Sequence, residues 1–317
     1  MKYDFITIGG AVRDFTFYLE PLKKKDSKLI CFLPGTKINI KDAYFTTGGG
    51  ACNVAVGLAN FGLKVATIIR IGKDHSGQAI LEKLKEKRVD TRFVQIDDKL
   101  HTGISAIIQP RGGERTILTY RGANDNLQLP ITNYQLPMTR WIYIASLSGE
   151  NWENLLNKIF NLKSRISNLR IVWNPGIIQL KAGRERLAKF LRKTDVLILN
   201  RQEAATLISK NPKQIQNLLL KIYQLGPKIV VITCGKEGAY VMDKNEIHYQ
   251  PAHPAKRVDT TGAGDSFSSG FLAGLVLFNN IKKALKLGIL NSAANLTKIG
   301  AQEGLLTKKD LKIRKDL

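Results

Sequence analysis

The order of apolar and polar residues along the chain predicts an alternation of strands and helices. Apolar runs of strand length occur at residues 5–8, 65–71, 141–145, 169–173, 196–199 and 229–233. Apolar positions at helical spacing mark the segments 49–61, 78–88, 152–166, 185–192 and 214–225. Gly62 follows the first of these segments, where a glycine commonly ends a helix. This alternation is typical of a mostly parallel sheet with helices on both faces, so we predict an α/β fold.

Two regions interrupt the alternation and predict a second, smaller sheet. The first, residues 13–44, contains two short apolar runs (29–33 and 38–40) around a Pro-Gly turn. The second, residues 94–120, contains β-rich runs on either side of a Gly-containing turn at 110–113, which is a hairpin pattern. Since the sequence shows no low-complexity linker or internal repeat, we predict one domain with a β-sheet appendage rather than two separate domains.

Composition and charge narrow the class of protein. The 317 residues suit one large α/β domain, and a hydrophobic content of 44% is that of a globular chain. The apolar runs are too short to cross a bilayer, and the first residues do not read as a signal peptide, so we expect a cytoplasmic protein. The three cysteines and four histidines are scattered, which argues against disulfides and zinc. The net charge of +23 is spread along the chain without a nucleic-acid-binding motif, so we expect a solvated basic surface.

The strongest chemical signal is the segment Asp-Thr-Thr-Gly-Ala-Gly-Asp at residues 259–265. It directly precedes a small, apolar segment at 266–278 that predicts a buried helix. Glycines before a helix let an anion approach the amides of its first turn, which the helix dipole makes a favourable anion site. Asp265 would repel a resting phosphate there, so we expect it to take the proton of an attacking hydroxyl. The alternative interpretation of a shorter motif is that the aspartate only caps the helix. The second aspartate of this motif, Asp259, favours a catalytic role for Asp265 over a cap.

Four segments together resemble the ribokinase/PfkB family of carbohydrate kinases. Residues 259–265 resemble the C-terminal signature of that family, and Gly-Gly-Gly-Ala-Cys-Asn-Val-Ala at 48–55 resembles its glycine-rich N-terminal signature. Asn-Arg-Gln-Glu at 200–203 resembles its NxxE motif, and Gly-Ala-Asn at 122–124 a segment of many sugar kinases. The resemblance implies a ribokinase-like three-layer α/β/α sandwich with a mostly parallel sheet. It also implies that residues 1–317 form one kinase domain with a small β-sheet lid, built from segments at about 13–45 and 94–121.

The resemblance assigns the transfer chemistry to the start of the predicted helix at 266–278. It implies that Asp265 is the general base and that Gly262, Ala263 and Gly264 form the anion hole for the transferring phosphoryl group. No P-loop motif (GxxxxGK followed by Ser or Thr) occurs in the sequence, and the glycine pairs lack the third glycine of a dinucleotide-binding fingerprint. We therefore expect phosphate binding to depend on the turn at 262–265.

The resemblance also assigns a nucleotide side and a metal side. The donor is ATP with Mg²⁺, and the implied nucleotide-binding residues are Asn200, Thr233, Gly235, Gly238 and Asn291. Glu203 is implied to hold Mg²⁺ through water, and Asp259 is implied to help hold a K⁺ ion. Asn200 and Glu203 follow a predicted strand directly, and ligands in open α/β sheets bind at that end of the strands.

The acceptor side is implied to comprise Asp14, Gly48, Gly49, Gly50, Asn53 and Asn124. Asn53 offers a donor and an acceptor to a pair of hydroxyl groups. Arg13 departs from the family pattern, and it either pairs with a phosphate or carboxylate on the substrate or lies on the surface of the lid. Arg115 and Arg121 either face the site or belong to a solvated hairpin face.

These residues predict a kinase that phosphorylates a hydroxyl of a small sugar or sugar-like molecule under a closing lid. A nucleoside is the main alternative acceptor, followed by a phosphorylated sugar. A non-catalytic ligand-sensing member of the family is the alternative from another class, and retention of Asp265 with its glycine turn argues against it. For partners we expect a homodimer through the lid edge, no specific nucleic acid and no membrane.

Overall fold

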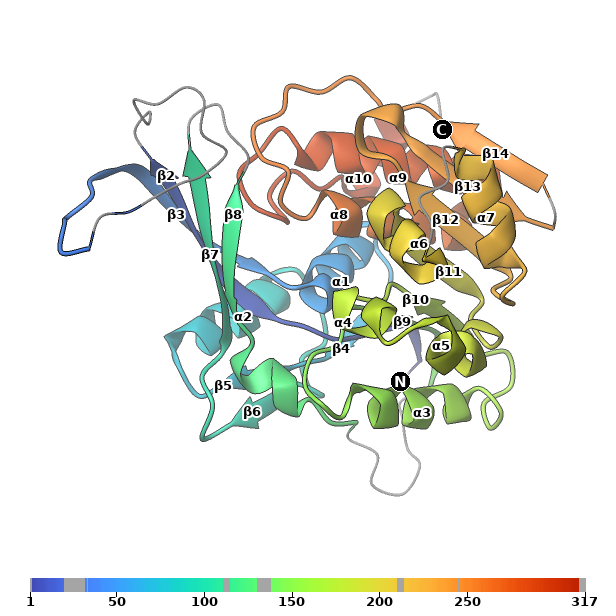
Figure 1. Cartoon of the computed structure of the whole chain (residues 1–317), viewed down its shortest axis with the longest axis horizontal. Helices are drawn as coiled ribbons and strands as arrows, with labels where there is room; N and C mark the ends of the chain where they lie inside the picture. Colours follow the sequence, from blue (N-terminus) through green and yellow to red (C-terminus); the bar gives the residue numbers. More distant parts are fainter. Residues whose placement is uncertain are drawn as a thin grey trace.

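The large sheet forms the centre of the molecule. The computed structural model describes residues 2–19, 32, 34–110, 115–129, 138–209, 214–244 and 246–313, with side chains to residue 311. The large sheet has eight strands in the order β14-β13-β12-β11-β10-β9-β1-β4 (Figure 1). Their bounds are β1 Tyr3–Ile8, β4 Val65–Ile68, β9 Thr139–Ile144, β10 Arg170–Trp173, β11 Val196–Asn200, β12 Ile229–Thr233, β13 Ala239–Asp243 and β14 Glu246–Gln250. The mostly parallel α/β fold predicted from the sequence is therefore confirmed.

The register explains why these strands read as continuous apolar runs. Phe5 of β1 pairs with Val65 of β4 on one side and with Trp141 of β9 on the other, both in parallel register. A parallel strand covered by helices on both faces buries every side chain, so its sequence shows no alternation of apolar and polar residues. At the other edge, β13 and β14 form an antiparallel hairpin that the sequence pattern did not predict.

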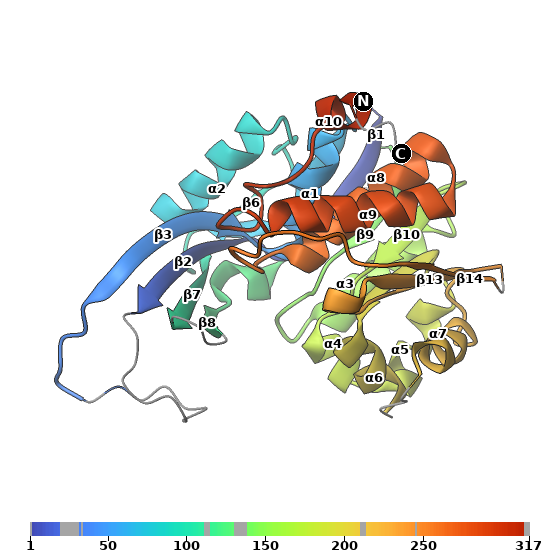
Figure 2. The ribbon, with the colours of Figure 1, turned by 90° about the horizontal axis from the view of Figure 1, so that it is seen from above.

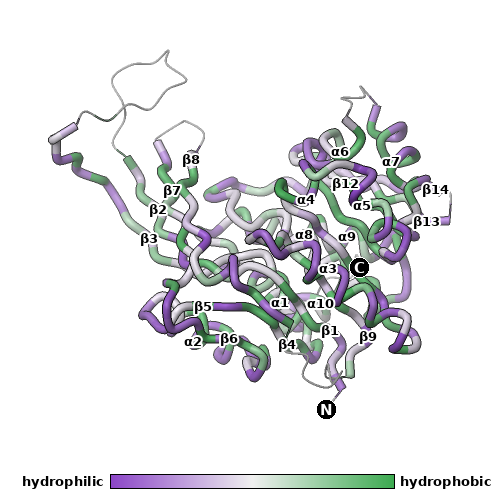
Figure 3. The backbone as a smooth tube through the Cα atoms, turned by 60° about the horizontal axis from the view of Figure 1, so that its bottom comes forward, coloured by the Kyte–Doolittle hydropathy of each residue, from purple (hydrophilic) through white to green (hydrophobic). Residues whose placement is uncertain are grey.

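Helices cover both faces of the large sheet and complete three layers (Figure 2). One layer contains α1 (Gly50–Asn60), α2 (His75–Glu86), α8 (Ala263–Phe278), α9 (Ile281–Asn295) and α10 (Lys308–Ile313). The other contains α3 (Trp152–Leu162), α4 (Ile177–Lys181), α5 (Arg184–Leu191), α6 (Arg201–Ile208) and α7 (Ile215–Tyr223). Hydrophobic and hydrophilic stretches alternate along α6 and α7, as expected of helices with one face on the sheet (Figure 3). Among the described residues, none of the helices combines the length and the apolar character that crossing a membrane requires.

Each helical layer has its own hydrophobic core. Trp173 of β10 packs edge-on against Phe160 of α3 and Phe190 of α5. On the opposite face, Phe271 of α8 belongs to the core that also contains Phe5 and residues of α1. The small residues of α8 allow α9 to approach it closely, because a Cβ on Gly274 would lie 2.5 Å from Cα of Ala284. The segment that carries the candidate site is thereby fixed in the core.

A small sheet of four strands projects from one end of the large sheet (Figures 1 and 2). Its order is β3 (Ile40–Gly48), β2 (Val12–Leu19), β7 (Gly103–Pro110) and β8 (Thr116–Tyr120). The strands β2 and β7 are parallel, whereas β3 and β8 pair antiparallel at the two edges. These strands come from the two regions that interrupt the sequence alternation. The predicted apolar run at 29–33 lies outside the described residues except for Phe32, and the predicted turn at 110–113 lies outside them except for Pro110.

One predicted strand is wrong in its extent. The apolar run at 65–71 is divided between β4, which ends at Ile68, and β5 (Arg70–Gly72). The second piece leaves the large sheet and pairs with β6 (Gln95–Asp97) in a separate sheet of two strands. Ile69 between them is fully buried, so the hydrophobic pattern continues across a change of sheet.

Candidate active site

The start of α8 presents an open turn of backbone amides. Gly262 precedes the helix with a left-handed backbone (φ 71°), and a Cβ there would lie 2.4 Å from that of Ala301, so only glycine fits. The helical ladder begins with the Ser266 amide, which donates to the Gly262 carbonyl at 2.8 Å. The amides of Gly264 and Asp265 precede that bond, and amides of a first helical turn have no carbonyl partner within the helix. A Cβ on Gly264 would meet no heavy atom within 4 Å, so this side of the turn is open to a ligand.

The Asp265 carboxylate is held beside this turn by a relay of buried amides. Asn53 Nδ2 donates to Asp265 Oδ2 at 2.7 Å, and Gln302 Nε2 donates to Asn53 Oδ1 at 2.8 Å. The Thr47 hydroxyl donates in turn to Gln302 Oε1 at 3.3 Å. Asn53 and Gln302 are buried, whereas Asp265 keeps part of its surface exposed. Desolvation of the carboxylate by the surrounding protein raises the pKa of Asp265. The hydrogen bond from Asn53 lowers it by a smaller amount.

Three consecutive glycines make room for the carboxylates of the site. A Cβ on Gly48 would lie 2.1 Å from Oδ2 of Asp14, and one on Gly50 would lie 3.6 Å from Oδ1 of Asp265. Gly49 itself has a positive φ of 95°, and a Cβ there would lie 2.4 Å from the carbonyl oxygen of Gly10. The glycine-rich segment therefore passes between two predicted site carboxylates, Asp14 and Asp265, and its third glycine, Gly50, is the first residue of α1.

Asp14 lies on the face of the small sheet that is turned toward α8. Its side chain is buried, and the hydroxyl of Ser105 on the neighbouring strand β7 is hydrogen-bonded to it. The pKa of Asp14 is raised to about 6, chiefly by burial. The hydrogen bond from Ser105 and the charge of Arg115 oppose the rise, whereas the negative charges of Asp259 and Asp265 contribute to it. The structure thus brings Asp14, Asp265 and Asp259 into one electrostatic environment although they are far apart in the sequence.

Asn124 occupies a different role from the substrate contact that the resemblance implied. It lies in the short 3₁₀ helix η1 (Gly122–Asn126) and is buried. Its Oδ1 accepts from the Ala11 amide at 2.8 Å, and its Nδ2 donates to the carbonyls of Ala11 and Arg121, both at 2.9 Å. Because both amide hydrogens are engaged by backbone, Asn124 fastens the start of β2 to η1 in this structure.

Arg13 points away from the acceptor side. It neighbours Asp14 on β2, and successive residues of a strand face opposite sides of the sheet. Arg13 lines a surface depression together with Glu82 and Glu86 of α2 and with Glu303. Of the two roles left open by the sequence, the structure therefore supports the surface position.

The predicted nucleotide residues gather at the carboxyl ends of β11 and β12. Asn200 and Thr233 are paired across these strands. Beyond Thr233, Gly235 opens the 3₁₀ helix η2 (Gly235–Glu237) and Gly238 closes it, with the Gly238 carbonyl accepting from the Cys234 amide at 2.8 Å. This edge of the sheet is where ligands of open α/β folds bind.

The NxxE motif is a capping box at the start of α6. The Glu203 amide donates to Asn200 Oδ1 at 2.9 Å, and the Asn200 amide donates to Glu203 Oε2 at 2.8 Å. Burial raises the pKa of Glu203, and the charge of Asp265 contributes to that increase. Glu203 therefore lies within electrostatic reach of the proposed base, and its other carboxylate oxygen is left for a ligand.

Asn291 is the predicted nucleotide residue that the structure places away from this edge. It is fully buried in α9. Its Nδ2 donates to the carbonyl oxygen of Ser266 at 2.7 Å and to the Ser269 hydroxyl at 3.2 Å, and its Oδ1 accepts from the Leu306 amide at 2.8 Å. The side chain ties α8 to α9 and to the segment before α10, and both of its amide hydrogens are engaged by α8.

The two implied metal ions fit the residues unequally. No group of three or more His, Cys, Asp or Glu side chains suited to a metal occurs among the described residues. Mg²⁺ arrives with nucleotide phosphates and keeps several waters, so one carboxylate such as Glu203 suits it. Asp259 does not fit K⁺, because Oδ1 accepts from the Thr261 amide and hydroxyl, both at 2.8 Å, and Oδ2 accepts from the Gly300 amide at 2.9 Å. The guanidinium group of Arg115 also lies 3.4 Å from Oδ1.

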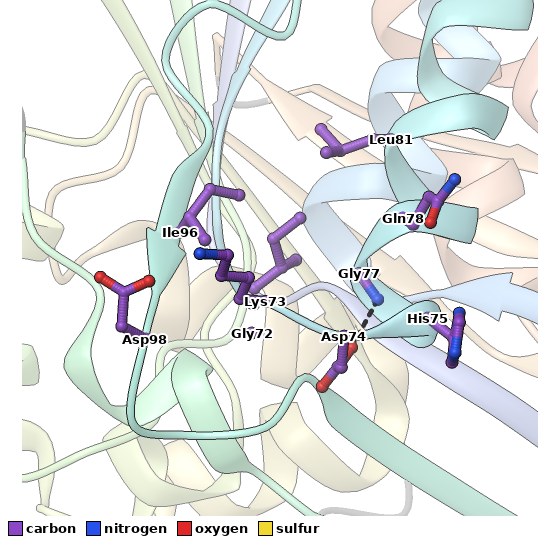
Figure 4. A pocket seen from close by; sticks show the side chains of 10 residues that line it. Gly72, Lys73, Asp74, His75, Gly77, Gln78, Leu81, Ile96 and Asp98 are labelled. Atoms are coloured by element: carbon purple, nitrogen blue, oxygen red, sulfur yellow. Dashed lines mark hydrogen bonds between the residues drawn. The ribbon is translucent and has the colours of Figure 1, made fainter.

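A separate cavity of about 730 Å³ lies at the start of α2 (Figure 4). Asp74 at its mouth caps α2 by accepting from the Gly77 amide at 2.8 Å, and it also accepts from the amide and hydroxyl of Thr102. These donors explain the lowered pKa of Asp74. None of the predicted site residues lines this cavity, so its geometry is that of a helix cap joined to a loop.

The fold and the carboxylate held against the amide turn of α8 are the features of a phosphotransferase with an alcohol group as acceptor. Comparison with known families agrees, because the profile described as "pfkB family carbohydrate kinase" matches residues 8–308. The chain belongs to this family, and it is therefore a sugar or nucleoside kinase of the ribokinase type.

Similar proteins act on several kinds of acceptor. An ATP-dependent 6-phosphofructokinase of Thermoanaerobacterium thermosaccharolyticum is 27% identical over 313 residues, which are 95% of this chain and 90% of that protein. The structure of Arabidopsis thaliana ribokinase complexed with ribose and ATP has a TM-score of 0.85 at 21% identity and covers 100% of both chains. The Methanocaldococcus jannaschii nucleoside kinase has a TM-score of 0.79 at 23% identity, covering 98% of this chain and 97% of that one. At these identities the two structures show the fold.

Three contributors to the site were not identified from the sequence. Gln302 and Thr47 belong to the relay behind Asp265, and Ser105 holds Asp14. Gln302 lies 249 residues from its partner Asn53, and no local pattern in the sequence marks this glutamine as a neighbour of Asn53. Ser105 occupies a strand register position that becomes visible only when β7 is paired with β2.

Proposed function

We propose that this protein transfers the γ-phosphoryl group of ATP, bound with Mg²⁺, to a hydroxyl of a small sugar in the cytoplasm. The observation that carries the proposal is the position of Asp265, which Asn53 holds at the start of α8 beside the open amide turn. A carboxylate with a raised pKa and an anion site within one helical turn combine the two functions that phosphoryl transfer to an alcohol needs.

In the proposed reaction, Asp265 takes the proton of the acceptor hydroxyl as its oxygen attacks the γ-phosphorus. The new O–P bond forms while the bond from phosphorus to the β,γ-bridging oxygen breaks, and the electron pair leaves with ADP. The turn formed by Gly262, Ala263 and Gly264 holds the charge of the transferring group, with the Gly264 and Asp265 amides lying ahead of the first helical bond. Asn200, Thr233, Gly235 and Gly238 bind the nucleotide, and Glu203 holds Mg²⁺ through water. This Mg²⁺ neutralises phosphate charge when it is bound.

A sugar is the acceptor that we propose first. Asp14 offers carboxylate oxygens to hydroxyl groups, and the missing side chains of the glycines at 48–50 let Asp14 and Asp265 both lie against that segment. Arg13, which supported a phosphorylated acceptor, faces α2 instead. The 6-phosphofructokinase relative and the nucleoside kinase neighbour keep a sugar phosphate and a nucleoside as the alternatives to test. A non-catalytic ligand-sensing role is the alternative from another class.

The test is release of ADP by the purified protein with Mg²⁺ and ATP. We would compare ribose, fructose and 2-keto-3-deoxygluconate with adenosine, inosine, cytidine and fructose 6-phosphate. We expect one neutral sugar or sugar acid to stimulate turnover, and we expect Asp265→Asn to lower kcat by about a hundredfold to ten-thousandfold. The matched control is Asp98→Asn, an exposed aspartate at the cavity of Figure 4. Turnover near normal in Asp265→Asn, or no stimulation by any acceptor in the folded protein, would contradict the proposal.

We also propose that the small sheet acts as a lid within one domain and that two copies associate through it. Its edge strands carry exposed apolar side chains, including Phe45 (55% exposed) on β3 and Leu118 (61% exposed) on β8. Exposed apolar strand edges are commonly covered by another chain. Light scattering after size exclusion should give a dimer mass that Phe45→Ser with Leu118→Ser reduces to a monomer. A monomer mass for the unchanged protein would contradict the association.

A further inference from the structure

Arg115 connects the small sheet to the turn that precedes the anion site. It stands directly before β8, and its Nη1 donates to the hydroxyl oxygens of Thr260 at 2.7 Å and Thr261 at 3.0 Å. The same nitrogen lies 3.4 Å from Oδ1 of Asp259. These partners are 144 to 146 residues away in the sequence, and the next residues are Gly262 to Gly264. The guanidinium group therefore joins the small sheet to the segment that sets the position of the amide turn.

The Arg115 contact is enclosed enough to be stronger than an ordinary surface ion pair. The side chain of Arg115 is 26% exposed and that of Asp259 is 8% exposed. Charge-assisted hydrogen bonds from a guanidinium group are stronger than bonds between neutral groups, and solvent screens them less when they are partly buried. Arg115 also lowers the pKa of Asp14, so its charge acts on the acceptor side as well.

Protein donors engage both carboxylate oxygens of Asp259. Oδ1 has the Thr261 amide and hydroxyl and the Arg115 guanidinium group, and Oδ2 has the Gly300 amide. A second positive charge at Oδ1 would be repelled by the guanidinium group at short range. An unpaired Asp259 carboxylate would attract a monovalent cation. Here Arg115 already supplies that positive charge.

We propose that Arg115 is a positioning residue that replaces a monovalent cation at Asp259 and orders the amide turn at 262–264 from the small sheet. This inference rests on the proposed function. It has two consequences. Phosphoryl transfer does not depend on K⁺, and the anion site is fully ordered only while the small sheet lies over the start of α8. Because the amide turn is then coupled to the position of the small sheet, hydrolysis of the donor would be suppressed when no acceptor holds that sheet in place.

The variants for the test change one charge on the small sheet. Arg115→Met removes the guanidinium group and keeps an unbranched side chain, and Arg115→Lys restores a positive charge. Lys41→Gln is the matched control, because Lys41 is exposed on β3 of the same sheet. For each protein we would measure kcat, the acceptor KM and the melting temperature in potassium chloride and in choline chloride at equal ionic strength.

We expect the unchanged protein and Lys41→Gln to have the same kcat, within about twofold, and the same melting temperature in both salts. Arg115→Met should lower kcat by about tenfold or more in choline chloride with a smaller change in acceptor KM. Potassium should restore part of that loss and raise the melting temperature of Arg115→Met only, because Asp259 then lacks the positive charge that the guanidinium group supplied. Arg115→Lys should recover activity in choline chloride.

Three outcomes would overturn the proposal. The first is a K⁺ requirement or a K⁺-dependent melting temperature in the unchanged protein. The second is an unchanged kcat in Arg115→Met. The third is a rise in acceptor KM confined to phosphorylated or carboxylated acceptors, which would show that Arg115 binds the substrate. If no acceptor stimulates turnover, the proposed function fails, and the melting temperatures in the two salts still decide whether Asp259 takes a cation.

Discussion

Replacing Asp14 by asparagine should stabilise the folded protein while it impairs acceptor binding. The side chain is only 4% exposed, and burial raises its pKa from the ordinary 3.8 to about 6. A carboxyl group with a raised pKa in the folded state is held preferentially in its neutral form. Folding is therefore penalised once the group ionises. Asparagine has nearly the same shape, stays neutral, and can still accept the hydrogen bond from Ser105.

The size of the effect follows from the shift in pKa. A difference of about two pKa units corresponds to roughly 3 kcal/mol between the two protonation states. Well below pH 3.8 the group is neutral in both the folded and unfolded chains, so the substitution gains nothing. As the pH rises through 6, the penalty develops fully in the unchanged protein and is absent from the variant. At pH 8 we expect Asp14→Asn to be more stable by up to about 3 kcal/mol, a rise in melting temperature of about 5 °C.

The assay is the melting temperature of both proteins between pH 4.5 and pH 8, with Asp42→Asn as the control. Asp42 is exposed on the adjacent strand β3, so its substitution should produce no pH-dependent difference. The acceptor KM of Asp14→Asn should rise in the same preparation, which separates stability from function. A difference in melting temperature that stays constant across this pH range, or a variant less stable at pH 8, would refute the reasoning.

Two further substitutions test the base and its anion site. Asn53→Leu removes the bond that lowers the pKa of Asp265, so the acid limb of the kcat profile should move to higher pH. An unmoved limb would show that Asn53 does not set that pKa. Gly262→Ala should lower the free energy of unfolding, measured in urea, by at least about 1 kcal/mol because its backbone is left-handed. The overlap of the new Cβ with Ala301 should add to this loss. Its control, Gly264→Ala, has open space at that position and should lower kcat without loss of stability, whereas equal stability of both variants would contradict this account.

The local parts of the fold could be predicted from the sequence because local signals determine them. Apolar runs and helical periodicities within single segments predict the buried strands and α1. The seven-residue motif at 259–265 predicts the glycine turn before α8. The division of the run at 65–71 between two sheets could not be predicted. Ile69 is as buried as its neighbours, and the change of partner depends on β6, which lies far along the chain.

The motifs located the candidate site more reliably than they described the state of its side chains. Asn124 and Asn291 occupy predicted positions, yet the side-chain amide of each is hydrogen-bonded to groups of other protein segments. Contacts with distant segments decide whether an asparagine side chain is free for a ligand. For Asn124 the partner lies more than a hundred residues away in the sequence. The same limit applies to Arg115, whose partners appear only when the small sheet is placed over α8. Motif spacing carries no information on such long-range contacts.

The electrostatics of the site differ from those of the whole chain. The net charge of the chain is +23. Around the start of α8, however, lie four carboxylates, those of Asp14, Glu203, Asp259 and Asp265. Within the part of the chain that the structure describes, the guanidinium group that pairs with them is that of Arg115. A triphosphate near these carboxylates would be repelled unless amide dipoles and Mg²⁺ compensate the negative charge. We predict that the exposed positive charge acts at longer range, by raising the local concentration of anionic nucleotides. Because exposed charges are screened over about 8 Å at physiological salt, added salt should slow nucleotide association more than the chemical step.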